Sequence, residues 1–148
     1  MGRNRVAVLG TGQTKYVAKR LDVTMAGMVR EAIDRALVDA GLTMDDIDAI
    51  AIGKAPDLFE GSMMPELAMA EAIGAVGKQL IRVHTAGSVG ASTAIVGSSL
   101  VSSGIHRRVL AVSWEKQSES NAMWALSIPV PFTMPVGAGA GGFFAPHV

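Results

Sequence analysis

Short apolar runs alternate with longer amphipathic segments along most of the chain. The apolar runs are rich in Val, Ile and Ala, as buried strands are, and lie at residues 5–10, 48–53, 80–85 and 107–113. The segments between them predict helices at residues 24–40, 65–73 and 88–103. This β-α-β-α-β-α-β order with short connections predicts an α/β layered fold with a mainly parallel sheet and right-handed crossovers.

The ends of the predicted helices carry the expected signals. Thr24 is a suitable N-cap for the first helix, and Gly41 a suitable residue to end it. The second helix is expected to begin near Ser62 and to end at Gly74. The third helix, 88–103, has no charged residue, which predicts that it is buried on nearly every side.

Composition excludes several classes of function. The 148 residues suffice for one domain, and 13 basic and 13 acidic residues give a net charge of zero. A balanced charge argues against nucleic acid as a partner, because phosphate binding needs a clustered basic face. The absence of cysteine excludes disulfides, thiolate metal sites and a thiol nucleophile, and we expect a cytoplasmic protein.

Two further classes of site are not expected. No pair of His or carboxylate residues has metal-ligand spacing, so no metal is predicted. No unbroken apolar run approaches about 18 residues, so no membrane span is predicted.

The end of the chain is unusual. From Ile128 the sequence "IPVPFTMPVGAGAGGFFAPHV" is rich in Pro and Gly and has no clear period. It is typical of a long connection rather than of the strand or docked helix that closes a domain. We therefore expect the chain to be a fragment of a larger protein.

Two motifs have a simple structural explanation beside a functional one. "GTGQTKY" follows the first predicted strand, but Lys15 stands where a dinucleotide fingerprint needs its third glycine, so a plain loop is favoured. His106, Arg107 and Arg108 form a basic cluster before the last strand. A solvated strand entry is favoured there over a phosphate contact.

The stretch "HTAGSVGAST" is the most informative part of the sequence. Sites in parallel sheets lie at the carboxyl ends of strands, and here a strand leads through small residues into a helix. Small residues let a ligand approach the backbone, and a helix N-terminus favours an oxyanion or lowers the pKa of a nucleophile. Close helix packing would use Gly87, Gly90 and Ala91 equally well. Ser88 could act as a nucleophile only with a base nearby, and His84 precedes it by four residues.

Three segments together resemble the thiolase superfamily, in its sterol-carrier and lipid-transfer branch. They are "VAVLGTGQTKY", "RVHTAGSVGASTA" and "RRVLAVSWEKQSES", in that order and spacing. The family turn reads roughly Asn-x-Cys-Ala-Ser/Thr-Gly, and counting back from Gly90 places its cysteine at Gly87. A frame set by "STA" places it at Ser88 instead; we prefer Gly87, and Thr85 then replaces the family's Asn.

The resemblance implies a division of the chain and a site. Residues 1–116 would form an incomplete first half of the thiolase-like fold, and 117–148 the start of its inserted loop domain. Thr85, Gly87 and Gly90 would line the substrate site, with Ser88 and His84 as candidate catalytic residues. No residue of this chain matches the catalytic His and second Cys of the family's other half, so the 148 residues alone are expected to be inactive.

The resemblance also implies substrates and partners. The substrate would be an acyl-CoA or sterol-CoA thioester of fatty-acid or steroid side-chain breakdown, with no bound cofactor. Loss of the cysteine favours aldol-type carbon–carbon cleavage, which needs an acid/base residue and an oxyanion site but no covalent acyl group. The alternatives are a non-catalytic acyl-CoA-binding or partner-supporting subunit and a thiolase that uses another nucleophile. A homodimer through strand 80–85 and an accessory acyl-CoA-binding subunit are the implied partners.

Overall fold

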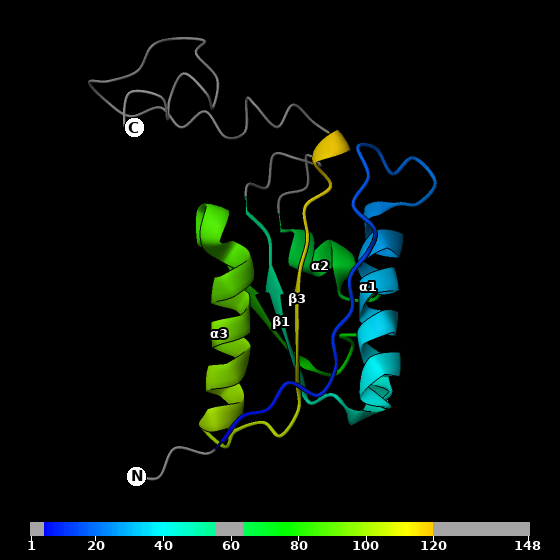
Figure 1. Ribbon diagram of the computed structural model, residues 1–148. Helices are drawn as coiled ribbons and strands as arrows, with labels where there is room; N and C mark the ends of the chain where they lie inside the picture. Colours follow the sequence, from blue (N-terminus) through cyan, green and yellow to red (C-terminus); the bar gives the residue numbers. More distant parts are fainter. Residues whose placement is uncertain (1–4, 56–63, 120–148) are drawn as a thin grey trace, which may run out of the picture.

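The computed structural model describes residues 5–55 and 64–119, in which a parallel sheet lies between helices (Figure 1). The helices are α1, α2 and α3, and the strands β1, β2 and β3. Their bounds are α1 Met25–Ala40, β1 Ala49–Gly53, α2 Pro65–Met69, β2 Gln79–Val83, α3 Val89–Ser102 and β3 Val109–Ser113. The described residues also form three short 3₁₀ turns, η1 Met44–Asp46, η2 Ala86–Ser88 and, after β3, η3 Gln117–Glu119. The described sheet has the order β2-β1-β3 and is parallel throughout, which confirms the predicted α/β class.

The caps predicted for α1 are present. The Thr24 hydroxyl accepts a hydrogen bond from the backbone N–H of Gly27 at 3.1 Å, which satisfies one of the free donors of the first turn. Gly41 ends the helix with φ of 65°, a left-handed conformation that glycine adopts without steric cost. The second helix is shorter than predicted, because α2 stops at Met69 and turns carry the chain to Gly74. Ser62 lies outside the described residues.

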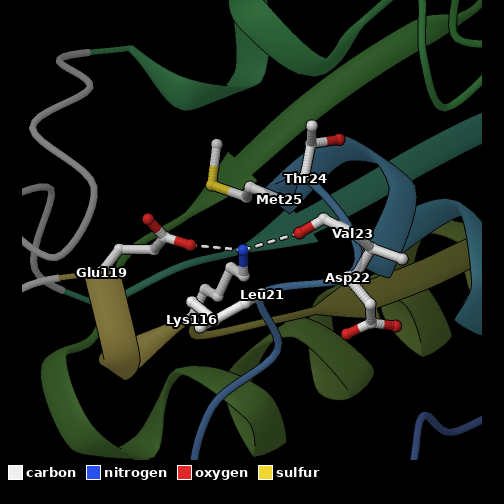
Figure 2. Close-up of a pocket in the computed structure, with 7 residues that line it drawn as sticks. All are labelled: Leu21, Asp22, Val23, Thr24, Met25, Lys116 and Glu119. Carbon is white, nitrogen blue, oxygen red and sulfur yellow. Dashed lines mark hydrogen bonds and ion pairs between the residues drawn. The ribbon is translucent and has the colours of Figure 1, made fainter.

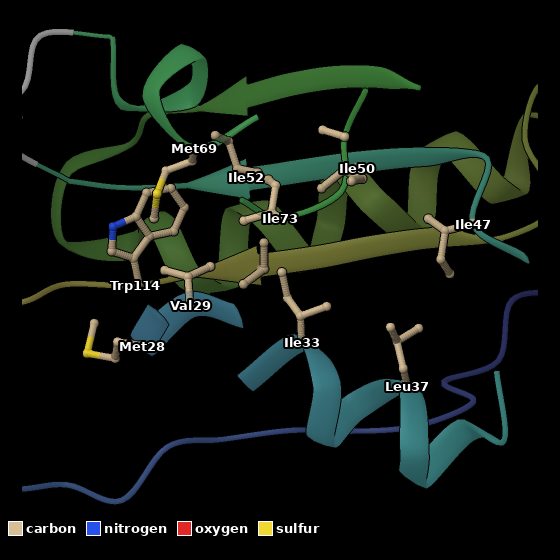
Figure 3. Packing of buried hydrophobic residues seen from close by; sticks show 12 residues of the cluster. Met28, Val29, Ile33, Leu37, Ile47, Ile50, Ile52, Met69, Ile73 and Trp114 are labelled. Atoms are coloured by element: carbon tan, nitrogen blue, oxygen red, sulfur yellow. The ribbon is translucent and has the colours of Figure 1, made fainter. Parts of the chain in front are cut away.

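The two faces of the central strand β1 are built from side chains of different size. Ile50 and Ile52 are fully buried and belong to one apolar cluster with α1, α2 and Val112 of β3 (Figure 3). Ala51 and Gly53 alternate with them and so face the other side, towards α3. Large residues therefore fill the α1 side of the sheet, whereas small residues let α3 approach it closely.

The approach of α3 to the sheet requires glycine at position 53 and is close at Gly97. A Cβ at Gly53 would overlap Oγ1 of Thr93 and lie 2.5 Å from Oγ of Ser113. A Cβ at Gly97 would lie 3.3 Å from the Cβ of Ala111. Thr93 is buried, and its hydroxyl donates to the carbonyl of Val89 at 2.7 Å, so this polar group is satisfied inside the contact.

The burial predicted for α3 is wrong in the described structure. Only Val89, Thr93 and Gly97, spaced one helical turn apart, are buried, and Ile95 on the outer side is 65% exposed. An uncharged sequence does not determine how much of a helix is covered. It is compatible with a helix buried on all sides and with one that packs along a single stripe.

The strand predicted at 5–10 does not form in the part of the chain that the structure describes. This segment makes no sheet pairing, and Val8 in it is 82% exposed. The chain that follows is instead held on α1, where the N–H of Thr11 donates to Asp39 at 2.8 Å and Arg35 donates to the carbonyl of Gln13. A Cβ at Gly10 would lie 2.6 Å from the carbonyl oxygen of Ala36. The "GTG" motif thus serves close packing on a helix, in agreement with the loop interpretation.

The basic cluster at the amino end of β3 is organised by one carboxylate. Asp48 accepts hydrogen bonds from the backbone N–H groups of Arg107 at 2.8 Å and Arg108 at 2.9 Å. Its own N–H donates to the carbonyl of Arg108, so these bonds join the entries of β1 and β3. The ring of His106 lies 2.5 Å from the amide oxygen of Gln79, at the entry of β2.

No helix in the described residues is long and apolar enough to cross a membrane.

We predict that acid weakens the fold through Asp48. The two backbone N–H groups lower the pKa of this carboxyl from its usual range, because they stabilise the charged form. Its contribution to the free energy of unfolding is therefore present above about pH 4, the unfolded pKa, and is lost as the pH falls through the lower folded pKa. In Asp48→Asn, the free energy of unfolding should depend less on pH in this range. Urea unfolding at a series of pH values measures this dependence.

Asp45→Asn is the control for removing one negative charge, since Asp45 is an exposed neighbour on η1. If the free energy of unfolding changed equally with pH in both variants between about pH 4 and pH 2, the role assigned to Asp48 would be wrong.

Candidate functional site

The carboxyl ends of the three strands meet at one edge of the sheet. Gly53 lies opposite Val83 on one side and Ser113 on the other, and the N–H of Trp114 donates to the carbonyl of Gly53 at 3.2 Å. The next residues along the strands, Lys54, His84 and Trp114, therefore leave the sheet side by side. Ligand sites of parallel α/β sheets lie at this edge.

The turn from β2 into α3 is closed by its own side chains. The Ser88 hydroxyl donates to the carbonyl of Thr85 at 2.8 Å, and the Thr85 hydroxyl contacts that of Ser92 at 2.7 Å. The sequence candidates His84, Thr85, Gly87, Ser88 and Gly90 are all exposed here. The structure thus brings the predicted site residues together on one accessible turn.

The backbone of this turn is strained at Ala86, next to Gly87, where there is room for a side chain. Ala86 has φ of 47°, in the left-handed region that costs a residue with a Cβ about 1 kcal/mol or more. A Cβ at Gly87 or Gly90 would meet no atom within 4 Å among the described residues. Close packing therefore does not explain these glycines in the described structure, whereas room for an approaching group remains. The glycine that the packing of α3 does require is Gly53.

A Ser–His pair does not form in the part of the chain that the structure describes. Ser88 gives its hydroxyl proton to a carbonyl oxygen, which cannot remove it. No hydrogen bond joins Ser88 to His84 among the described contacts.

Two charged residues that the sequence analysis did not single out lie at the same edge. Lys54 follows β1 and is fully buried, and its Nζ lies 3.6 Å from Oε2 of Glu115, which follows β3. The other carboxylate oxygen of Glu115 accepts the N–H of Ala55 at 2.5 Å. The sequence does contain a signal for this pair, because each residue comes just after a predicted strand. The carboxyl ends of parallel strands lie at the same edge of a sheet.

A second buried lysine is already engaged in the structure. Lys116 donates to the carbonyl of Val23 at 2.7 Å and pairs with Glu119 (Figure 2). With these residues, Leu21, Asp22, Thr24 and Met25 line a cavity of about 520 Å³ at the start of α1. The contacts of Lys116 tie the chain after β3 to the chain before α1, so we assign this lysine a structural role.

No group of three or more His, Asp or Glu residues that could hold a metal ion occurs in residues 5–55 and 64–119.

The chain is similar to sterol carrier protein 2 from several animals. It is 28% identical to the rabbit (Oryctolagus cuniculus) protein over 119 residues, which are 79% of this chain and 21% of the relative. It is 27% identical to the human (Homo sapiens) protein over the same length and coverage. The chain thus spans about a fifth of the length of the curated relatives it matches. No family model matches the sequence.

Two solved structures share the fold. One is 3-oxoacyl-[acyl-carrier-protein] synthase III from Aquifex aeolicus VF5, with a TM-score of 0.57 and 23% identity over 68% of this chain and 32% of that structure. The other is the priming β-ketosynthase of the R1128 polyketide pathway, with a TM-score of 0.56 and 22% identity over 72% of this chain and 33% of that structure.

The comparisons confirm the resemblance to a thiolase-type fold and to the sterol-carrier branch. The division at residue 116 stays a prediction, because most of 117–148 lies outside the described residues.

We predict that Lys54→Met destabilises the fold strongly. The change leaves the carboxylate of Glu115, which is only 21% exposed, without this cation, and breaking a buried ion pair costs about 3 kcal/mol or more. Urea unfolding measures the loss. Lys15→Met is the control, since Lys15 is exposed and its loss should change the free energy of unfolding by less than about 0.5 kcal/mol. Similar values for both variants would show that the pair contributes little.

We also predict that a thiol placed at Gly87 is activated. Gly87→Cys adds a side chain where none meets a neighbour, just before the N-terminus of α3, whose dipole lowers the pKa of a thiol from about 8.5. Iodoacetamide should alkylate it at least tenfold faster at pH 6.5 than Ser98→Cys, an exposed thiol in the middle of the same helix. Identical pH profiles for the two variants would argue against an activating turn.

Proposed function

We propose that these 148 residues act as part of a longer thiolase-like enzyme of the lipid-transfer type. Its substrates would be acyl-CoA thioesters with fatty-acid or steroid side chains, and no cofactor would be bound. The observation that carries the proposal is the turn between β2 and α3. It keeps the strand end, the helix N-terminus and the room of a nucleophile turn, but carries glycine at position 87.

The missing thiol favours aldol-type cleavage over thiolysis. In a retro-aldol reaction a base removes the proton of the β-hydroxyl, the Cα–Cβ bond breaks, and a carbonyl forms at Cβ. The electron pair passes to the thioester enolate, which then takes up a proton at Cα. Hydrogen-bond donors that hold the thioester oxygen lower the barrier of this step. No acyl group is transferred to the protein, so glycine at position 87 is compatible with the chemistry.

Support for a lipid-like substrate comes from similarity to a sterol carrier protein over most of the chain. Support for a homodimer comes from β2, which is an edge strand of the described sheet and can extend the sheet across a two-fold axis. An accessory acyl-CoA-binding subunit and a cytoplasmic location complete the proposal. A thiolase that uses Ser88 is disfavoured, because its hydroxyl bonds a carbonyl oxygen rather than a base.

The proposal predicts that the whole protein cleaves a β-hydroxyacyl-CoA without added coenzyme A. Mass spectrometry should show a carbonyl product, the shortened acyl-CoA and no acylated protein. A trapped acyl-enzyme, or a strict need for free coenzyme A, would contradict the aldol assignment. Tight acyl-CoA binding with no turnover would favour the alternative of a non-catalytic binding subunit.

A further inference from the structure

A large groove separates β3 from the first described residues of the chain. Its volume is about 590 Å³, and residues 5–12 form one wall and β3 the opposite wall (Figure 1). The other two walls are the helices, α1 through Ile33 and Leu37, and α3 through Gly97 and Val101. Protein interiors contain few voids larger than one water, whose share of liquid volume is about 30 Å³. The groove therefore lies in the layer of the sheet, between the two covering helices, and is too large to be a packing defect.

The main chain of β3 presents an unpaired sheet edge to this groove. The carbonyl of Arg108 and the N–H of Trp114 bond to the chain of β1 and the residue before it, so the even-numbered residues of β3 face β1. Main-chain groups alternate between the two sides of a strand. The odd-numbered residues therefore turn their N–H and carbonyl groups towards the groove, and the described sheet has no strand on that side. These residues are Val109, Ala111 and Ser113.

The opposite wall has the sequence of a strand but no partner. Residues 5–10 join no sheet in the described structure, and the apolar side chains of Val8 and Leu9 are exposed. The end of this segment is nevertheless fixed on α1, because a Cβ at Gly10 or Gly12 would overlap main-chain atoms of that helix. An apolar run is thus held beside an unpaired strand edge, with a groove between them. A sheet that lacks one strand at this place would leave the same arrangement.

We propose that the groove receives a β-strand from a later part of the same polypeptide, beyond residue 148. The assignment rests on the part of the proposed function that makes these residues a portion of a longer protein. The strand pairs with the main chain of β3 on one side and with residues 5–10 on the other, and segment 5–10 thereby becomes the strand that its sequence predicts. An acyl chain has no donors or acceptors to match a row of successive peptide groups.

Three arguments favour this source for the strand. The matched segment is only 21% of the rabbit relative, so a chain of that length has ample residues to supply a strand. A strand in the middle of a sheet excludes proline, because its N–H groups are needed, and residues 129–146 contain four prolines. The edge strand of a second copy would bring the helices that cover its own sheet, and these would meet α1 and α3.

Hydrogen exchange on the whole protein tests the strand, with β3 as its own control. The N–H groups of Leu110 and Val112 bond to β1 and should exchange slowly whether or not the groove is filled. In a filled groove, the N–H groups of Val109, Ala111 and Ser113 should exchange within about tenfold of that rate. In an open groove they should exchange at least about a hundredfold faster, and that result would overturn the proposal. Mass spectrometry with electron-transfer fragmentation gives the rate for each residue.

Photo-cross-linking in the whole protein identifies the occupant. Val8 is exposed and lines the groove, so p-benzoylphenylalanine at this position should cross-link to residues beyond 148 of the same polypeptide. Val38 on α1 is as exposed as Val8 but does not line the groove, and the same label there should not reach that segment. A cross-link from position 8 to residues 120–148, to a second copy or to another protein would overturn the assignment.

The outcomes separate this proposal from the proposed function. If the intact mass of the natural protein shows that its chain ends at residue 148, both proposals fall. If the chain is longer but Val109, Ala111 and Ser113 exchange as in an open groove, the proposed function stands and the strand is wrong. If these N–H groups are protected but the whole protein does not cleave a β-hydroxyacyl-CoA, the strand stands and the proposed reaction is wrong.

Discussion

The close contact between α3 and the central strand is the constraint on which the candidate site depends. A helix can approach a sheet this closely only if the facing positions are small, and Gly53, Gly97 and Ala111 meet that condition. Thr93 stands between them with its hydroxyl turned back onto its own helix, so the contact buries no unsatisfied polar group. The first turn of α3 is thereby fixed beside the carboxyl end of β1.

Charged groups secure the two ends of the sheet in different ways. At the amino end, Asp48 binds main-chain N–H groups at the surface, where water remains available to both partners. At the carboxyl end, Lys54 is fully buried beside Glu115, where removal from water costs each ion several kcal/mol. The first arrangement is an ordinary way to join two strand entries. The second is expensive, and it lies at the edge of the sheet where the ligand sites of parallel sheets are found.

The sequence predicted those features that depend on local chemistry. The caps at Thr24 and Gly41, the strand runs before Gly53 and Ser113, and the glycine turn into α3 all follow from residues near one another in the chain. The segment 5–10 has the same apolar character as a strand, yet a strand needs a partner edge, and here the following glycines dock on α1 instead. The predicted burial of the outer face of α3 is wrong for a related reason. Composition does not show which other elements pack against a helix.

The charged pair could not be found from periodicity. Lys54 and Glu115 come together because two parallel strands end at the same level, with Gly53 opposite Ser113. They are 61 positions apart in the sequence, and each comes just after a short apolar run. The predicted site, by contrast, was contiguous, since Thr85 to Gly90 form a single turn.

The strain at Ala86 connects the fold to the chemistry proposed for this turn. A left-handed alanine is unfavourable, so the surrounding structure must hold it, and the hydrogen bonds of Thr85 and Ser88 do so from both sides. If the turn served packing alone, glycine would be expected at position 86 and a side chain at 87, where there is room for one. The reverse arrangement leaves no atom of the described residues within 4 Å of a Cβ placed at position 87. A turn that keeps a costly backbone and an open position beside a helix N-terminus suits the binding of a carbonyl group, and glycine at position 87 offers no side chain that could act as a nucleophile.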